Sequence, residues 1–277
     1  MVEALGYGFM LRALVGSLLV GTACSLVGVY VVLRGMAFLG DGLAHASFGG
    51  VTLGFLLGIN PLFTAIIFTL ATAGLVQLTS RRAQLRIDAA IGVFFSFTMA
   101  LALVFLGLMR RYDARLYGFL FGNVLGISRE NLVLMLILTS IVVLTLACLH
   151  QEFKFLTFDE ELAQAQGLPT ALLSGIMLGL IALCVVVSIK AVGIILVSAL
   201  LVTPAATALQ LTNRFSLMFL LSWIAGLVSC VLGMLLSYWL DIPSGASIVI
   251  TLTLLFALAT IFSPKRRTCR ICARPPT

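Results

Sequence analysis

Long apolar stretches without polar alternation dominate the chain, and charged residues, Asn-Pro or Gly separate them. A helix needs about 20 residues to cross a hydrocarbon core of roughly 30 Å. The pattern therefore predicts an all-α fold, a polytopic transmembrane bundle of about eight or nine helices. The nine predicted spans are 9–33, 36–58, 61–79, 88–108, 130–149, 169–188, 192–210, 215–239 and 246–262.

Two segments determine the number of crossings. Residues 116–126 are too few to span and too apolar for an ordinary loop, so a half-helix or re-entrant segment is expected there. The turn at 189–193 either separates two spans or breaks a single one, and the second alternative would leave eight crossings. Residues 9–33 lack the cleavage pattern of a secretory signal peptide and are expected to form the first span.

Composition supports a membrane protein with one domain. Apolar residues make up 61% of the 277 residues and charged residues 10%, against about 45–50% and 25% in soluble domains. We expect a transmembrane domain over 1–264 and a basic cytoplasmic tail over 265–277. The net charge of +7 does not predict nucleic-acid binding, because the basic residues fall in short loops and the tail.

The basic residues also predict the orientation. With the loop 80–87 in the cytoplasm, eleven of the seventeen lie inside, although the cluster at 110–115 lies outside. These eleven are Arg34, Arg81, Arg82, Arg86, Lys154, Arg214, Lys265, Arg266, Arg267, Arg270 and Arg274.

The cysteines do not predict a disulfide framework. Four of them lie in or at the end of apolar stretches and are expected to be buried thiols: Cys24, Cys148, Cys184 and Cys230. Cys269 and Cys272 form a C-x-x-C in the tail, which is similar to half a zinc knuckle or to a redox pair. Without a second pair nearby, a functional role is not expected.

Asp41 and His45 are the main candidates for chemistry. They stand four residues apart in the apolar segment FLGDGLAHASFGG, so they share a helix face. Ionisable groups within a membrane usually face a cavity or an ion path, and carboxylate and imidazole both bind divalent transition metals. Thr52 continues this face and is a further candidate. Alternatively, Asp41 orients His45 or pairs with Arg34.

The longest polar interruption, residues 151–169, is expected to be cytoplasmic and to form a short helix within 152–168. Asp159, Glu160 and Glu161 would lie in its first turn and Gly167 at its C-cap. An exposed acidic helix of this kind is a natural docking element for a soluble partner.

Two further charged positions, near the ends of spans, are additional candidates for the ion path. Lys190 opens the segment KAVGIILVSALLVTPAATA, and Asp241 lies in LDIPSG, where it could attract cations or cap the helix starting at Ser244. The chain contains neither a phosphate-binding G-x-x-x-x-G-K-[ST] nor an H-E-x-x-H. If the protein uses ATP, another chain would have to bind the nucleotide.

With these features in place, the chain resembles the permease subunits of bacterial zinc and manganese ABC importers. The resemblance extends over nearly the whole chain and rests on four segments. They are VVLRGMAFLGDGLAHASFGGVTLG, LYGFLFGNVLGIS, the acidic loop ending in AQAQGLP, and KAVGIILVSALLVTPAATA followed by LDIPSG. The basic tail departs from the family pattern.

The resemblance implies a multi-pass protein of the bacterial cytoplasmic membrane that forms a homodimer and holds no permanent cofactor. It further implies cytoplasmic ATPase subunits docking on 152–168, an extracytoplasmic metal-binding protein, and a metal path at Asp41 and His45. The form GDGLAHAS looks more like the zinc-type members, so Zn²⁺ is the expected cargo, with Mn²⁺ or Fe²⁺ as alternatives.

Three other functions remain open from the residues alone. A proton-coupled metal carrier could use Asp41 and His45 as a proton relay and would need no ATPase. A membrane-embedded enzyme would need further metal ligands or a nucleophile with its base. A purely structural subunit would tolerate replacement of both side chains or would misfold.

Overall fold

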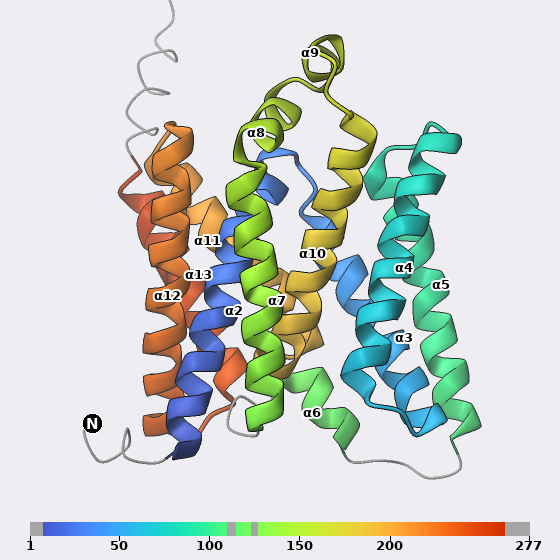
Figure 1. Ribbon diagram of the computed structural model, residues 1–277. Helices are drawn as coiled ribbons and strands as arrows, with labels where there is room; N and C mark the ends of the chain where they lie inside the picture. Colours follow the sequence, from blue (N-terminus) through green and yellow to red (C-terminus); the bar gives the residue numbers. More distant parts are fainter. Residues whose placement is uncertain (1–7, 110–114, 123–126, 264–277) are drawn as a thin grey trace, which may run out of the picture.

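The computed structural model describes residues 8–109, 115–122 and 127–263, except the side chains of Arg115, Lys190 and Ile195. Over these ranges it contains helices and no strands (Figure 1), which confirms the predicted all-α bundle. Nine long helices correspond to the nine predicted spans. They are α2 (Gly8–Leu33), α3 (Phe38–Leu57), α4 (Pro61–Arg82), α5 (Ile87–Leu108), α7 (Arg129–Cys148), α10 (Thr170–Val192), α11 (Val197–Leu211), α12 (Phe215–Leu240) and α13 (Ser244–Ile261).

Seven of these helices are long and apolar enough to cross a membrane. The exceptions are α3, whose hydropathy is lowered by Asp41, His45 and its glycines, and α11, which has only 15 residues. Both pack mainly against other helices of the bundle: α3 against α4 and α5, and α11 against α2, α12 and α13. Surrounded in this way, neither needs the continuous apolar surface that a lipid-facing helix needs.

Consecutive long helices run in opposite directions through the bundle (Figure 1). The short helices α8 (His150–Phe158) and α9 (Glu160–Ala165) lie at one end, and α6 (Arg115–Phe121) lies at the other. Helix α6 confirms the short helix expected within 116–126. Gly193, with φ 85°, and the 3₁₀ turn η2 (Ile194–Leu196) connect α10 to the oppositely directed α11. Residues 189–193 thus lead into a turn between two helices.

Basic residues gather at the end of the bundle that carries α8 and α9. Arg34 follows α2, Arg81 and Arg82 end α4, and Arg214 precedes α12. Because short cytoplasmic loops are enriched in Lys and Arg, this is the end that the sequence assigns to the cytoplasm, and the orientation stays a prediction. The basic tail and residues 110–114 lie outside the described residues.

Three of the four cysteines expected to be buried are buried. The Cys24 thiol lies 2.9 Å from the Ser188 hydroxyl, while Cys184 donates to the Ala23 carbonyl. The prediction was wrong for Cys148, which is exposed as the last residue of α7. Cys269 and Cys272 lie outside the described residues.

Small residues allow the helix backbones to approach closely. A Cβ atom on Gly28 of α2 would overlap the Leu201 carbonyl oxygen of α11, and one on Gly21 would meet Gly226 of α12. The Ser222 hydroxyl of α12 also donates to the Ser25 carbonyl of α2, at 2.7 Å. Apolar side chains are already satisfied by lipid, so van der Waals contact and hydrogen bonds of this kind must hold a membrane bundle together.

We predict that Gly28→Ala lowers the melting temperature of the detergent-solubilised protein by roughly 3–8 °C, because overpacking costs about 1–3 kcal/mol. Gly74→Ala in α4 is the matched control, since its Cβ would meet no atom within 4 Å. Thermal unfolding followed by size-exclusion chromatography measures both variants. Equal melting temperatures for the two would contradict the close α2–α11 contact.

Candidate functional site

Helix α3 packs through its glycines on three sides. A Cβ on Gly40 would press on Leu201 of α11, one on Gly42 on a side chain of α5, and one on Gly50 on the backbone of α4. The side chains of Asp41 and His45 lie on the part of the helix surface between the α11 and α5 contacts, and both are half-buried. Close contact on the other sides therefore fixes where this polar face points.

The local sequence sets where α3 begins and ends. Gly35, with φ 67°, turns the chain after α2, and Gly58, also with φ 67°, donates to the Gly54 and Phe55 carbonyls at the other end. Asp41 lies in the first turn of α3, where a carboxylate is favoured by the helix dipole. Its position is thus compatible with an otherwise apolar environment.

The imidazole ring of His45 packs against an aromatic side chain, and one of its nitrogen atoms has no hydrogen-bond partner. Its ring stands edge-on to Phe95 of α5, with centroids 4.8 Å apart and an interplanar angle of 86°. Its Nδ1 atom is buried and has no hydrogen-bond partner. A buried polar atom without a partner costs about 1–3 kcal/mol, so this nitrogen is available to a ligand that the chain itself does not supply.

The alternative roles considered for Asp41 find no support in the structure. Asp41 makes no hydrogen bond to His45 within the described residues, and Arg34 pairs with Glu160 instead. The Asp41 carboxylate and the His45 Nδ1 atom are therefore not engaged by another side chain of the described residues. Over the described residues, no group of three or more His, Cys, Asp or Glu side chains could hold a metal, so one copy of the chain contributes two such side chains here.

The three further candidates differ from this pair. Thr52 is fully buried, and its hydroxyl donates to the Gly49 carbonyl at 2.9 Å; its place on a path stays a prediction. Asp241 is exposed at the far end of the bundle, has φ 52°, and does not cap α13. The backbone of Lys190 belongs to α10, but its side chain lies outside the described residues.

The predicted single helix within 152–168 is instead two helices, α8 and α9. Asp159 separates them, because its extended backbone ends α8 and its carboxylate accepts the Leu162 N–H at 2.8 Å as the N-cap of α9. Glu160 and Glu161 form the first turn of α9, and Gly167, with φ 82°, follows its end. Phe153 of α8 is fully buried, which the polar character of the segment did not indicate.

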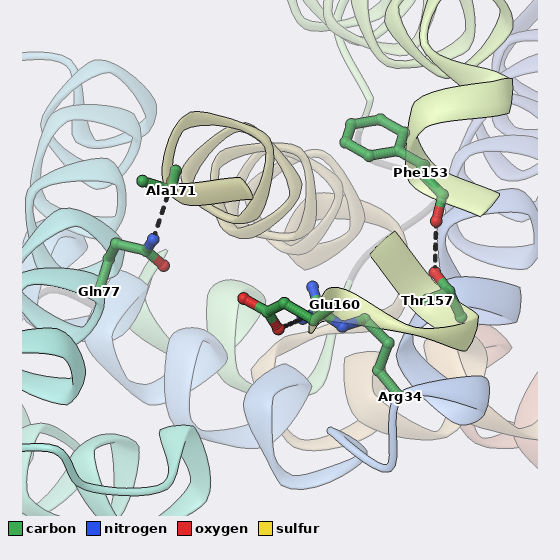
Figure 2. Close-up of polar contacts among 6 residues, drawn as sticks. All are labelled: Arg34, Gln77, Phe153, Thr157, Glu160 and Ala171. Atoms are coloured by element: carbon green, nitrogen blue, oxygen red, sulfur yellow. Dashed lines mark hydrogen bonds and ion pairs between the residues drawn. The ribbon is translucent and has the colours of Figure 1, made fainter. Parts of the chain in front are cut away.

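An ion pair connects α9 to the turn that leads into α3. Arg34 donates to the Glu160 carboxylate at 2.9 Å (Figure 2), and its side chain is only 11% exposed. Burial lowers the pKa of Arg34 from its ordinary value, and the charge of Glu160 opposes this shift. The ion pair thus joins α9 to the turn that lies seven residues before Asp41.

Further contacts at the end of the bundle that carries α8 and α9 hold neighbouring elements together. The hydroxyl of the buried Tyr30 lies 3.2 Å from Nδ1 of His150, whose ring packs on Phe215 and Phe219 of α12. The Gln77 amide of α4 donates to the Ala171 carbonyl of α10, and Thr157 donates to the Phe153 carbonyl (Figure 2). His150 lies at the span end predicted for it, packed into this aromatic cluster.

The sequence reading missed two acidic residues. Asp88 in α5 and Glu152 in α8 each bury one carboxylate oxygen without a hydrogen-bond partner. Asp88 stands at the boundary of an apolar stretch, where a carboxylate looks like a simple helix start. A lone acid facing inward rather than into solvent is visible only once the helices are packed.

Comparison with known proteins identifies the family. A model of the ABC 3 transport family matches residues 6–263. The chain belongs to this family. ABC 3 transport family membership and the seven apolar helices make it a multi-pass protein of the cytoplasmic membrane.

Individual members of the family are similar over almost their full length. The chain is 37% identical to the manganese transport system membrane protein MntC of Halalkalibacterium halodurans, covering 95% of this chain and 90% of the relative. It is 33% identical to the manganese import system permease protein ScaB of Streptococcus parasanguinis, covering 94% and 93%. Among solved structures, PsaBC from Streptococcus pneumoniae in complex with Fab superposes with a TM-score of 0.87, at 31% identity and 98% coverage of both chains.

We predict that Arg34→Ala loosens α9. Partly exposed ion pairs contribute about 0.2–1 kcal/mol, so amide hydrogen exchange in residues 160–165 should become roughly two- to fivefold faster. Glu160→Gln should have the same effect, whereas Glu161→Gln, which removes a neighbouring exposed carboxylate, should leave exchange unchanged. Equal exchange in all variants would show that the ion pair does not hold α9 in place.

Proposed function

We propose that this chain is the membrane-spanning permease of an ATP-driven importer for a divalent transition metal, with Mn²⁺ as the first cargo to test. The observation that carries the proposal is the pair Asp41 and His45 on α3. Both side chains are half-buried and uncommitted within the span, and His45 presents a buried nitrogen without a partner. Such groups are costly inside a membrane unless an ion path uses them.

The choice of cargo rests on the relatives rather than on the pair itself. The form GDGLAHAS favoured Zn²⁺, but relatives that match the chain over nearly its whole length are named for manganese transport or import. Carboxylate oxygen and imidazole nitrogen accept both ions. We therefore place Mn²⁺ before Zn²⁺ and expect both to be measured side by side.

A second copy of the chain would complete the site. Mn²⁺ prefers six ligands, mainly oxygen, and one copy supplies Asp41 and His45. A two-fold axis beside α3 would bring a second pair towards the same path, with water filling the remaining positions. A shell of this kind binds weakly, which suits a transporter because the ion must also leave.

The α8–α9 segment is the proposed docking site for the cytoplasmic ATPase subunits. It projects at the basic end of the bundle, and its acidic residues Glu160 and Glu161 are exposed. ATP-dependent movement of a docked subunit would reach α3 through Glu160 and Arg34. An extracytoplasmic metal-binding protein would deliver the ion at the opposite end, so the bundle would open alternately to each side.

We predict that Asp41→Asn and His45→Gln each reduce ⁵⁴Mn²⁺ uptake at least tenfold. The assay uses proteoliposomes containing the chain, its ATPase and its binding protein, with all variants matched for assembly. Each change removes a ligand while keeping a similar side-chain volume. Glu130→Gln, which removes an exposed first-turn carboxylate of α7, is the control and should retain normal uptake. Uptake by Asp41→Asn within twofold of wild type would exclude this pair from the path.

The energy source distinguishes the proposal from a proton-coupled carrier. In the same proteoliposomes, uptake should require internal ATP and stop when the ATPase subunit is inactivated. It should persist when an ionophore removes the proton gradient. The opposite pattern, in which uptake without ATP collapses on addition of the ionophore, would establish the carrier instead.

A further inference from the structure

We infer that Asp88 of α5 is a second cation-binding point, which accepts the metal ion between the Asp41–His45 pair and the cytoplasm. The inference rests on the proposed function, because it assigns Asp88 to the same transport path. It adds a residue that the sequence pattern did not single out.

The first observation is a carboxylate oxygen without a hydrogen-bond partner. Asp88 is half-buried, and its Oδ1 atom is buried without a hydrogen-bond partner. Asp88 lies in the first turn of α5, whose N-cap is Arg86; the helix dipole favours a carboxylate there, but it does not supply the hydrogen bond that the buried Oδ1 atom lacks. Leaving it bare costs free energy, which a passing cation would recover.

The second observation is the register between α5 and α3. A Cβ on Gly42 would press on the Ile91 side chain, the His45 ring meets Phe95, and a Cβ on Gly49 would meet the Thr98 carbonyl. Helices α5 and α3 therefore run in the same direction here, and successive positions of α5 (91, 95 and 98) lie beside successive positions of α3 (42, 45 and 49).

This register places Asp88 relative to the proposed site. Asp88 precedes Ile91 by three residues, about 4.5 Å along the helix axis, and so lies one turn closer to the cytoplasmic end than the Gly42 contact. It stands beside the first turn of α3, which carries Asp41. The same stripe of α5 that contacts His45 therefore ends in a carboxylate on the cytoplasmic side.

The chemistry favours a separate binding point over a third ligand. Asp41, His45 and Asp88 do not form a three-ligand group in the described part of the chain. An ion would therefore move from the mixed nitrogen and oxygen pair to a single carboxylate and water. Successive weak sites of this kind allow an ion to enter and still be released, and a lone carboxylate suits a hard dication.

The test replaces Asp88 by Asn and by Cys and measures ⁵⁴Mn²⁺ and ¹⁰⁹Cd²⁺ uptake in the assembled proteoliposomes. Asp88→Asn should lower Mn²⁺ uptake at least fivefold. Asp88→Cys should shift the Cd²⁺-to-Mn²⁺ uptake ratio at least fivefold towards Cd²⁺, since thiolate prefers the softer ion. Glu130→Asn and Glu130→Cys are the matched controls and should change neither quantity.

The outcomes separate this inference from the proposed function. An unchanged Cd²⁺-to-Mn²⁺ ratio in Asp88→Cys would overturn the inference even if uptake fell, because a merely structural aspartate would reduce both ions equally. Normal Mn²⁺ uptake by Asp88→Asn would also overturn it. If instead Asp41→Asn transports normally, the proposed path itself fails.

Discussion

Close backbone contact around α3 is the constraint on which the rest of the bundle depends. Lipid offers apolar side chains an environment as favourable as the protein interior, so helices associate through tight contact and hydrogen bonds. The glycines of α3 permit that contact with α11, α5 and α4 at once. Contact on three sides thereby fixes the orientation of the helix, and with it the direction in which the polar face of Asp41 and His45 points.

The same constraint explains why a polar helix can exist here at all. Helix α3 is less apolar than the seven clear spans and would be a poor lipid-facing element. Its neighbours shield most of its surface, and the free energy gained from packing offsets the cost of the half-buried acid and imidazole. Arg34, in the turn that precedes this shielded helix, then pairs with Glu160 of the acidic surface helix α9.

The sequence predicted the helices well, because membrane spans can be recognised from the length and hydropathy of apolar stretches. All nine predicted stretches became helices, and the short α6 was expected. The sequence predicted the polar segment before α10 less well. The burial of Phe153 and the break at Asp159 depend on how this segment packs against the bundle. Asp41 and His45 stood out by their spacing, whereas Asp88 did not, because its inward direction depends on the α3–α5 register.

The unsatisfied atoms of the bundle argue for transport rather than storage. Buried polar groups without partners are rare in folded proteins. The described residues contain five, and two of them, on His45 of α3 and Asp88 of α5, lie along the register that these helices share. A storage site would gather four or more ligands around one point and hold its ion tightly. In the proposed path the ligands are few and spread along the helix axis, so each would bind weakly and none would retain the ion. That spacing suits a path through which an ion must pass, and a second copy of the chain would strengthen it without closing it.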